Sequence, residues 1–498
     1  MFRYKDDLVA RLILDDLNSK VALVGIDGQN IRSLITTLRD DLDIAEEEEL
    51  REKKVKELVN EMIENSSLHG LNYIFNRRFT VRRVFWFFVT VVAFGIAVQK
   101  VYESTVNYLS YPFITVRTRR YVDELAFPSV SFCNINDMRM STLRGSLVDE
   151  AIKLQDPYIL ANDSEANWKL TKKAAHLKEE MILQCSYNGI PCSHKNFSEF
   201  YWMQGERCYT FNDGKSGMDI LKTRTPGRRG SLELTIDIQH YDYYRDRSKA
   251  GIHLILHDQD ETPVRIEGPR ISPGFSTHVQ LKGQKYINLP APYATRCGTK
   301  ELTFFDAYSR NLCWLDSVTK HVEATCGCKD YFMPGDHIPV CGIAKFMNCT
   351  WPHWEHHNDV KAFDCPLPCE VYKYGHKLSR STYPSKSHVR YLMEKFPVLR
   401  DAHENSTGRT RDAKEFLRDT LVRLVVYYDD LSYELIQQKP SYDTLVWLGD
   451  VGGTIGLFVG AGVMTYFEFI DCLMMVVHTL FFEKIDKQKS MSKQNLTG

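Results

Sequence analysis

The residues most able to do chemistry are three carboxylates inside an otherwise apolar stretch, Tyr442–Leu480. Asp450 lies near the start of this stretch, and Glu468 and Asp471 lie in its second half. Ionised side chains at membrane depth are costly, and they usually face an ion pathway rather than lipid. The three carboxylates therefore predict a cation pathway along this segment, with Glu468 and Asp471 at its inner mouth.

The same segment is longer than one bilayer crossing requires. As a single helix from Leu445 to Leu480 it would extend roughly 54 Å at ~1.5 Å per residue, against about 30 Å of hydrocarbon. The run Gly460-Ala461-Gly462 supplies a break, and non-helical backbone at membrane depth survives where it packs in protein or lines water. The alternative is a long membrane anchor whose middle is softened by glycine.

A second apolar segment defines the topology. Val84–Val98 carries no charge, and its apolar character continues to Tyr102, about the 20 residues of one crossing. Because this segment begins at Val84, it is not a signal peptide. Positive charges flank the outer ends of both segments, which predicts that both termini are cytoplasmic. These residues are Arg77, Arg78, Arg82, Arg83, Lys484, Lys487, Lys489 and Lys493.

The two segments divide the chain into five predicted regions. Strand-like alternation, as in Ser231–Ile238, and helical patterns, as in Asn167–Cys185, predict a mixed α+β fold for the large middle region. The regions are a cytoplasmic stretch (1–83), a transmembrane helix (84–106), a cysteine-rich extracellular domain (107–440), a second transmembrane helix broken at 460–462 (441–482) and a cytoplasmic tail (483–498).

Cysteines are concentrated in the predicted extracellular region. Of the 13 cysteines, all but Cys472 lie between Cys133 and Cys369. An even set on that side of a membrane predicts a disulfide framework, whose connectivity spacing alone leaves open. Zinc is the alternative, because a histidine-rich segment, 353–357, lies nearby. An oxidising compartment favours disulfides, so we predict no metal site.

Glycosylation sequons follow the same division. Four fall in the predicted extracellular region and could carry glycans, at Asn162, Asn196, Asn348 and Asn405. Two more, at Asn65 and Asn495, would lie in the cytosol and stay unused.

Charge and motif content exclude several classes of function. The chain has 63 basic and 64 acidic residues, which offers no general attraction to nucleic acid. It contains no phosphate-binding glycine loop, nucleophile elbow or His-Glu-x-x-His motif. We therefore predict that the protein is not an enzyme and needs no cofactor. A gated channel, a pore-less receptor or adhesion ectodomain, and an ectoenzyme with an unrecognised catalytic set remain, and the polar residues of the last segment favour the channel.

A series of short motifs runs from His69 to Asp471. They are His69-Gly70, Phe127-Pro128, Cys208–Asn212, Ser272–Phe275, Leu289–Pro292, Met333–Asp336, Leu431–Glu434, Leu448–Gly462 and Phe467–Asp471. In this order, and combined with two spans, they resemble the epithelial sodium channel/degenerin superfamily, nearest to its acid-sensing and invertebrate peptide-gated branches. The resemblance implies a homo- or hetero-trimer of related subunits in the plasma membrane, with palm, finger, thumb, knuckle and β-ball subdomains outside. It also implies an amiloride-sensitive pore for sodium ions.

The resemblance also assigns roles to individual residues. Those at the outer end of the second span correspond to the gate, the glycine run to the selectivity filter, and the His-Gly motif to a loop that lines the inner vestibule. Two tyrosines and a palm glutamate correspond to residues that couple gating to the extracellular domain. These are Gly449 and Asp450 for the gate, Gly460, Ala461 and Gly462 for the filter, His69 and Gly70 for the vestibule, and Tyr111, Tyr293 and Glu434 for coupling.

The cysteine pairing implied by the resemblance uses all twelve extracellular cysteines. The expected pairs are Cys133–Cys208, Cys185–Cys192, Cys297–Cys369, Cys313–Cys365, Cys326–Cys349 and Cys328–Cys341. Acid-sensing relatives have a seventh bridge, whose two positions here are Ser317 and Phe363, so both partners are absent together.

Two departures from the family pattern concern selectivity and gating. Gly462 replaces the third filter residue, a serine, which weakens the expectation of strong sodium preference. The histidine pair and aspartate that follow the first span in acid-sensing members are replaced by Tyr111-Pro112-Phe113 and Thr118. In the thumb, Trp351 replaces one carboxylate while Glu355 remains, and Lys222 of the chloride site faces Trp314 and Val318. We therefore expect gating by an extracellular ligand, a neuropeptide, with proton-gated or constitutive activity as alternatives.

Overall fold

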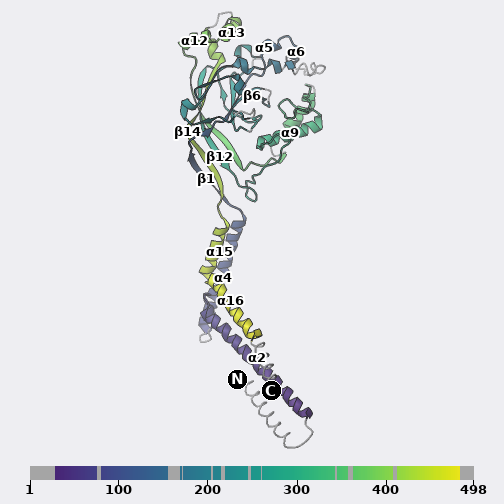
Figure 1. Ribbon diagram of the computed structural model, residues 1–498, viewed down its shortest axis with the longest axis vertical. Coiled ribbons are helices and arrows are strands. Elements are labelled where there is room, and N and C mark those ends of the chain that lie inside the picture. The colour runs from purple at the N-terminus through teal and green to yellow at the C-terminus, as the bar shows by residue number, and fades with distance from the viewer. Residues whose placement is uncertain are drawn as a thin grey trace, which may run out of the picture. The chain divides into compact units, whose positions relative to one another are not determined.

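The computed structural model describes residues 29–75, 80–154, 169–170, 172–203, 206–214, 219–244, 248–259, 261–342, 345–356, 363–407 and 412–482. The chain forms two compact units (Figure 1). One combines Met1–Pro112 with Tyr442–Gly498, and the other is Phe113–Ser441. We call them the helical unit and the sheet unit.

Within its described residues, the helical unit contains two helices that are long and apolar enough to cross a membrane, judged by length and composition. They are Thr80–Leu109 and Val463–Leu480, and Thr444–Val459 is a shorter apolar helix. Their large side chains are mostly exposed, as in Phe85 and Phe88 at 61% each, which suits contact with lipid. The elements are α2 (Gln29–Asn65), α3 (Leu71–Phe75), α4 (Thr80–Leu109), α15 (Thr444–Val459), α16 (Val463–Val477) and a π turn, η7 (His478–Phe482).

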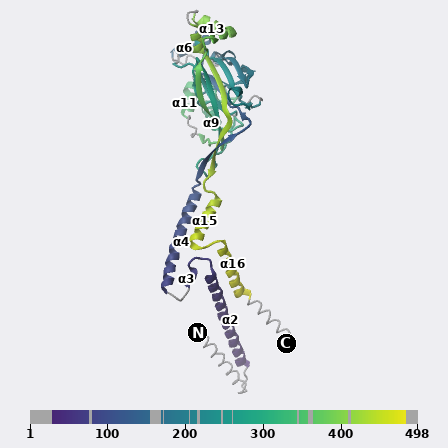
Figure 2. The ribbon, with the colours of Figure 1, turned by 90° about the vertical axis from the view of Figure 1, so that its left-hand side faces the viewer.

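Helices α4 and α15 lie side by side in both views (Figures 1 and 2). Near their common end, Tyr108 stacks on Trp447 with ring centroids 5.3 Å apart. The indole N–H of Trp447 donates to Thr105 Oγ1 at 3.3 Å, and the hydroxyls of Tyr108 and Thr444 are 3.1 Å apart. These contacts pair the first span with the first half of the second.

A seven-stranded sheet forms the centre of the sheet unit. Its longest strand, β14, is rich in β-branched and aromatic residues and buries most side chains from Leu421 to Tyr428, as expected of a central strand. It runs parallel to β12 and antiparallel to β1 and β9. The order is β13 (Glu370–Thr382), β12 (Phe275–Ile287), β14 (Leu421–Pro440), β9 (Leu232–Asp237), β4 (Ile182–Tyr187) and β5 (Ile190–Cys192), with β1 (Phe113–Tyr121) also on β14.

A five-stranded antiparallel sheet packs with the first around a shared core. Phe132 of β3, Leu234 of β9, Leu254 of β10 and Val422 of β14 are each fully buried in it. The order is β11 (Arg270–Ile271), β10 (Ile252–His257), β3 (Ser129–Asn134), β7 (Arg207–Phe211) and β6 (Phe197–Tyr201), and β2 (Leu125–Ala126) pairs separately with β8 (Lys222–Thr223).

Short helices surround these sheets (Figure 1). One sequence prediction is wrong here, because the helical pattern assigned to Asn167–Cys185 ends in strand β4. Pairing of Cys185 with Leu234 of β9 and its disulfide to Cys192 override the local helical preference. The helices are α5 (Met140–Leu143), α6 (Leu147–Leu154), α8 (Lys178–Met181), α9 (Arg310–Cys326), α11 (Trp351–His356), α12 (His388–Lys395), α13 (Pro397–Thr407) and α14 (Ala413–Thr420), with short turns η2 (His194–Asn196), η3 (Gly227–Gly230), η4 (His240–Asp242) and η5 (Phe346–Thr350).

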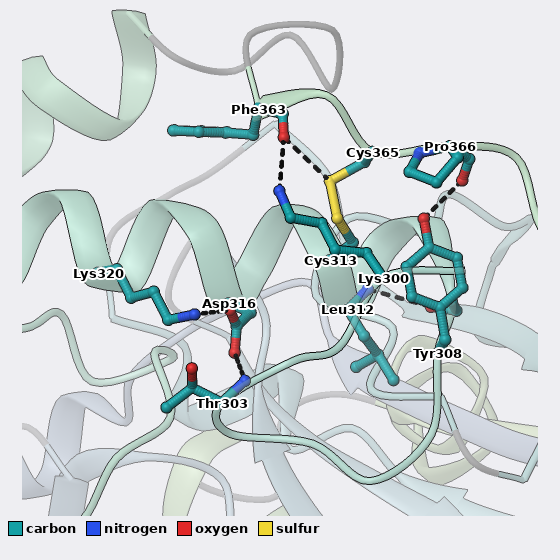
Figure 3. The surroundings of a disulfide bond; sticks show 11 residues. Lys300, Thr303, Tyr308, Leu312, Cys313, Asp316, Lys320, Phe363, Cys365 and Pro366 are labelled. Atoms are coloured by element: carbon teal, nitrogen blue, oxygen red, sulfur yellow. Dashed lines mark hydrogen bonds and ion pairs between the residues drawn. A yellow bond between two sulfur atoms is a disulfide. The ribbon is translucent and has the colours of Figure 1, made fainter. Parts of the chain in front are cut away.

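Helix α9 is joined to neighbouring loops of the cysteine-rich part by a disulfide and by hydrogen bonds (Figure 3). Ser309 caps its start by accepting from the Leu312 N–H at 3.0 Å. Buried Asp316 accepts from the Thr303 N–H at 2.6 Å and pairs with Lys320 at 2.7 Å, which fastens the preceding loop to the helix. The helix begins at Arg310, and residues 302–309 before it form that loop.

The disulfides join the twelve cysteines in the pairs that the resemblance implied. They are Cys133–Cys208, Cys185–Cys192, Cys297–Cys369, Cys313–Cys365, Cys326–Cys349 and Cys328–Cys341. Cys472, in α16, is the free cysteine of the described residues. The zinc alternative therefore loses its thiolate ligands, since a bridged sulfur does not ligate as a thiolate.

Candidate pore and its inner vestibule

The second span is interrupted at its glycine run (Figure 2). Helix α15 ends where Gly460 takes a left-handed conformation, with φ of +79°, and its N–H donates to Gly456 O at 3.1 Å. Glycine adopts this conformation without the penalty that a Cβ brings. Helix α16 starts after Gly462, whose N–H donates to Thr465 Oγ1 at 3.0 Å. The interruption therefore lies at the three residues that the sequence predicted as a filter.

A loop from the other end of the chain packs against this interruption. We call residues 66–70 the pre-span loop. The His69 N–H donates to Val459 O at 2.9 Å, so it satisfies a carbonyl that the end of α15 leaves free. A Cβ on Gly460 would lie 2.6 Å from His69 Cδ2 and 2.7 Å from Ser67 O. The loop and the break are thus in direct contact.

Gly70 holds the pre-span loop against the first span. Its φ is +84°, and an added Cβ would lie 2.4 Å from Thr90 Oγ1 of α4. Only glycine fits such a backbone conformation at this distance. Of the two predicted vestibule residues, His69 therefore contacts the second span and Gly70 contacts the first.

The two inner carboxylates, Glu468 and Asp471, lie in different surroundings from each other. Glu468 accepts from the Ser67 N–H at 3.2 Å and from the Ser67 hydroxyl at 3.4 Å, and that hydroxyl is 2.5 Å from Thr465 Oγ1. Asp471 and Glu468 line a cavity of about 200 Å³ together with Glu61, a residue of α2. The sequence did not predict a role for Ser67 or Thr465. The only signal that could have indicated Ser67 was its position two residues before His69.

The outer end of α15 carries the predicted gate residues. Asp443 caps the helix by accepting from the Val446 N–H at 2.8 Å. The Tyr442 hydroxyl donates to the Asp450 carboxylate, and its oxygen is 2.6 Å from Ser104 Oγ of α4. Around Gly449, nothing lies within 4 Å of an added Cβ. Asp450 is therefore oriented by Tyr442, a residue that the sequence did not single out.

The predicted coupling residues lie in both units. Glu434 of β14 accepts from Gln284 Nε2 of β12 at 3.0 Å, which places it inside the central sheet. Tyr111 belongs to the helical unit and Tyr293 to the sheet unit, so their coupling stays a prediction. Lys222 pairs with Glu124 at 2.8 Å, while Trp314 and Val318 are fully buried.

A model of the amiloride-sensitive sodium channel family matches residues 62–472. The chain belongs to this family. The match includes the pre-span loop, the first span, most of the second span and all six disulfides. Channels of the family conduct sodium, are trimers of related subunits in the plasma membrane and are not enzymes.

Similar proteins of this family include several acid-sensing ion channels. Acid-sensing ion channel 1B of Danio rerio is 30% identical over 460 residues, covering 87% of this chain and 79% of that protein. Acid-sensing ion channel 1C of Danio rerio is 31% identical over 456 residues, covering 83% and 82%. Acid-sensing ion channel 2 of Homo sapiens is 29% identical over 464 residues, covering 85% and 87%.

Among solved structures, a proton-activated chloride channel overlays with a TM-score of 0.34 at 8% identity, covering 79% of this chain and 98% of that one. This likeness is too weak to bear on the fold or the function.

The free space around Gly462 leads to a prediction about selectivity. Its φ is −110°, and nothing lies within 4 Å of an added Cβ, so serine fits without moving the backbone. We expect Gly462→Ser to increase the preference for sodium over potassium, because a hydroxyl adds an oxygen dipole at the predicted filter. The measurement is the shift in reversal potential when external sodium is replaced by potassium.

Gly462→Ala is the control for that shift, because it adds the Cβ without the hydroxyl. Equal shifts for the two variants would contradict a role for the hydroxyl.

Proposed function

We propose that this sodium channel subunit assembles as a trimer whose amiloride-sensitive pore is opened by an extracellular ligand. The observation that carries the pore assignment is the break at Gly460, with its freed Val459 carbonyl bonded by the His69 N–H. A plain membrane anchor needs no interruption, whereas non-helical backbone at membrane depth survives where it packs in protein or lines water, and a pore provides both surroundings. A receptor without a pore would not need the break at Gly460 or the loop that packs against it.

The proposed ligand is a neuropeptide. The motive is the loss of the histidine pair after the first span and the depletion of thumb carboxylates, which leaves few groups that titrate near pH 6 at those positions. Trp351, which replaces one of those carboxylates, and Glu355 both lie on α11 in the thumb region.

Proton gating is the second candidate, and two buried carboxyl groups favour it. Burial raises the pKa of Asp330 to about 7, although the Tyr331 N–H donates to it at 2.7 Å. Burial likewise raises the pKa of Asp237 to about 6, despite hydrogen bonds from Thr420 and Tyr241. Both groups would take up protons as the outside is acidified, and the relatives described above are acid-sensing channels by name.

Recording from oocytes that express this chain alone separates the candidates. The stimuli are a step to pH 6, a panel of amidated neuropeptides and each stimulus again with amiloride. An amiloride-blocked current evoked by a peptide but weakly by acid supports the proposal. A large, fast current at pH 6 supports proton gating instead, and no current under any condition favours the pore-less receptor.

Asp330→Asn tests the buried carboxyl directly. Because its pKa lies above that of an unfolded aspartate, Asp330 favours the folded state most at low pH, and this contribution is lost as pH rises through about 7. We expect acidification from pH 7 to 6 to stabilise the buried arrangement by about 1 kcal/mol through this group. The asparagine of this variant cannot titrate, so the change in thermal unfolding midpoint between these pH values should shrink.

Glu355→Gln, an exposed thumb carboxylate, serves as the control. An unchanged pH dependence in Asp330→Asn would remove this residue from any acid response.

The topology predicts where glycans attach. Asn196, Asn348 and Asn405 are exposed on the sheet unit, while Asn162 and Asn495 lie outside the described residues. We expect Asn→Gln at Asn162, Asn196, Asn348 or Asn405 to remove one glycan each, and Asn65→Gln to remove none. Mobility before and after enzymatic deglycosylation measures this, and a glycan traced to Asn65 would contradict a cytoplasmic N-terminus.

A further inference from the structure

A cavity of about 410 Å³ lies at one end of the five-stranded sheet, where β3 ends and β7 and β10 begin. Its wall includes apolar Ile135 and Trp202 and the charged side chains of Glu206, Lys249 and Arg270. It is within the size range of small-molecule sites, roughly 300–1,000 Å³. None of these residues belongs to the pore or the vestibule.

The ring of Trp202 forms an apolar part of the cavity wall. The side chain is only 3% exposed. The ring is held edge to face against His253, with centroids 4.8 Å apart, so the position of this part of the wall is fixed.

His253 lines the cavity as a neutral imidazole rather than as a cation. The Gly268 N–H donates to His253 Nε2 at 2.9 Å, so the ring proton sits on Nδ1. Burial lowers the pKa of His253, and the nearby positive charge of Arg270 lowers it further, while Glu267, 3.5 Å from Nε2, acts in the opposite direction. The imidazole is therefore neutral at physiological pH.

The charges on the wall favour an anion. Lys249 and Arg270 are exposed at the mouth, and neither forms an ion pair within the part of the chain that the structure describes. Glu206 is the one carboxylate on the wall among the described residues, so cations outnumber it. Arginine presents a planar donor pair that matches a carboxylate.

We propose that this cavity binds a small organic carboxylate, with Lys249 and Arg270 as charge partners and the ring of Trp202 as an apolar contact. The apolar surfaces of Ile135 and Trp202 favour an organic acid over an inorganic anion, because they offer an inorganic oxyanion no polar partner. The carboxylate belongs either to a free acid or to an acidic side chain of a peptide, and the two sources share this chemistry.

The test measures ligand-induced stabilisation of the detergent-purified full-length protein, since a ligand that binds the folded state raises its unfolding temperature. The probes are sodium benzoate for a free acid, N-acetyl-aspartic acid amide for a peptide side chain, and sodium phosphate for an inorganic anion. Sodium chloride at the same ionic strength is the reference. We expect a saturable rise with benzoate or the aspartate derivative, and little with phosphate.

Three variants assign that rise to the cavity. Arg270→Met removes a charge-assisted bond and should raise the half-saturating concentration by ~tenfold or more. Trp202→Phe shrinks the apolar ring on the wall and should raise the half-saturating concentration by less, roughly threefold. Glu206→Gln removes the opposing charge and should lower it. Arg224→Met is the matched control, because Arg224 is 80% exposed and pairs with Glu124 away from the cavity.

Several results would overturn the proposal. These are no saturable shift with either carboxylate, an equal shift with sodium chloride, a larger shift with phosphate than with benzoate, or an unchanged shift in both Arg270→Met and Trp202→Phe. A shift that Arg224→Met also abolishes would equally place binding elsewhere. None of these readouts depends on current, so they are independent of the proposed gating.

Discussion

Gly449→Phe yields a channel that conducts at rest. An added Cβ meets nothing within 4 Å in its own chain, so we expect the variant to fold. In the proposed trimer, three copies of α15 converge at this level, and small residues allow such close approach of helices. Overpacking costs about 1–3 kcal/mol, and each 1.4 kcal/mol changes an equilibrium about tenfold. We therefore expect the open-to-closed ratio to rise roughly ten- to hundredfold, measured as amiloride-blocked current without stimulus.

Gly95→Phe is the matched control for this substitution. Gly95 is a glycine of the first span, on α4, and an added Cβ there also meets nothing within 4 Å. We expect its resting current to equal that of the unaltered channel. If Gly449→Phe stays silent at rest while it still opens to the stimulus, the gate lies elsewhere.

We expect Gly460→Ala, by contrast, to abolish current. The left-handed backbone at this residue costs an alanine roughly 1–2 kcal/mol. The new methyl group would also lie 2.6 Å from His69 Cδ2 and 2.7 Å from Ser67 O, so the pre-span loop must move away. Current normalised to surface protein, measured by biotinylation, separates loss of conduction from loss of folding.

Gly462→Ala is the matched control, two residues further along. Its backbone is in a conformation open to any residue, and its Cβ would occupy empty space. We expect this variant to conduct. Equal currents from the two alanine variants would show that contact with the pre-span loop is not needed for conduction.

Local sequence predicted the elements whose signal is local. The glycine run located the break, because glycine both ends helices and tolerates positive φ. The alternation in Ser231–Ile238 located β9, Leu232–Asp237, within one residue at each end. Spacing could not choose among cysteine pairings, so the observed pairs were reached only through the family resemblance.

Contacts between residues far apart in the sequence could not be predicted from local sequence patterns. Ser67 and Glu468 are 401 residues apart, and nothing near either residue indicates the other. The bond from Tyr442 to Asp450 spans only eight residues, yet the sequence assigned Asp450 to the gate without indicating Tyr442 as its partner. The helix predicted at Asn167–Cys185 failed for a related reason, since β9 imposes a strand on its last residues.

The bond between Ser67 and Glu468 has a consequence for exchanging parts between channels. Residues 66–70 supply the His69 N–H to the break, the Ser67 N–H and hydroxyl to Glu468, and Gly70 to the first span. A chimera that carries only 444–480 into a relative would therefore face a foreign loop at each of these points. We therefore expect the transplantable conduction module of this protein to be discontinuous, with a minimal graft that comprises the pre-span loop together with the second span.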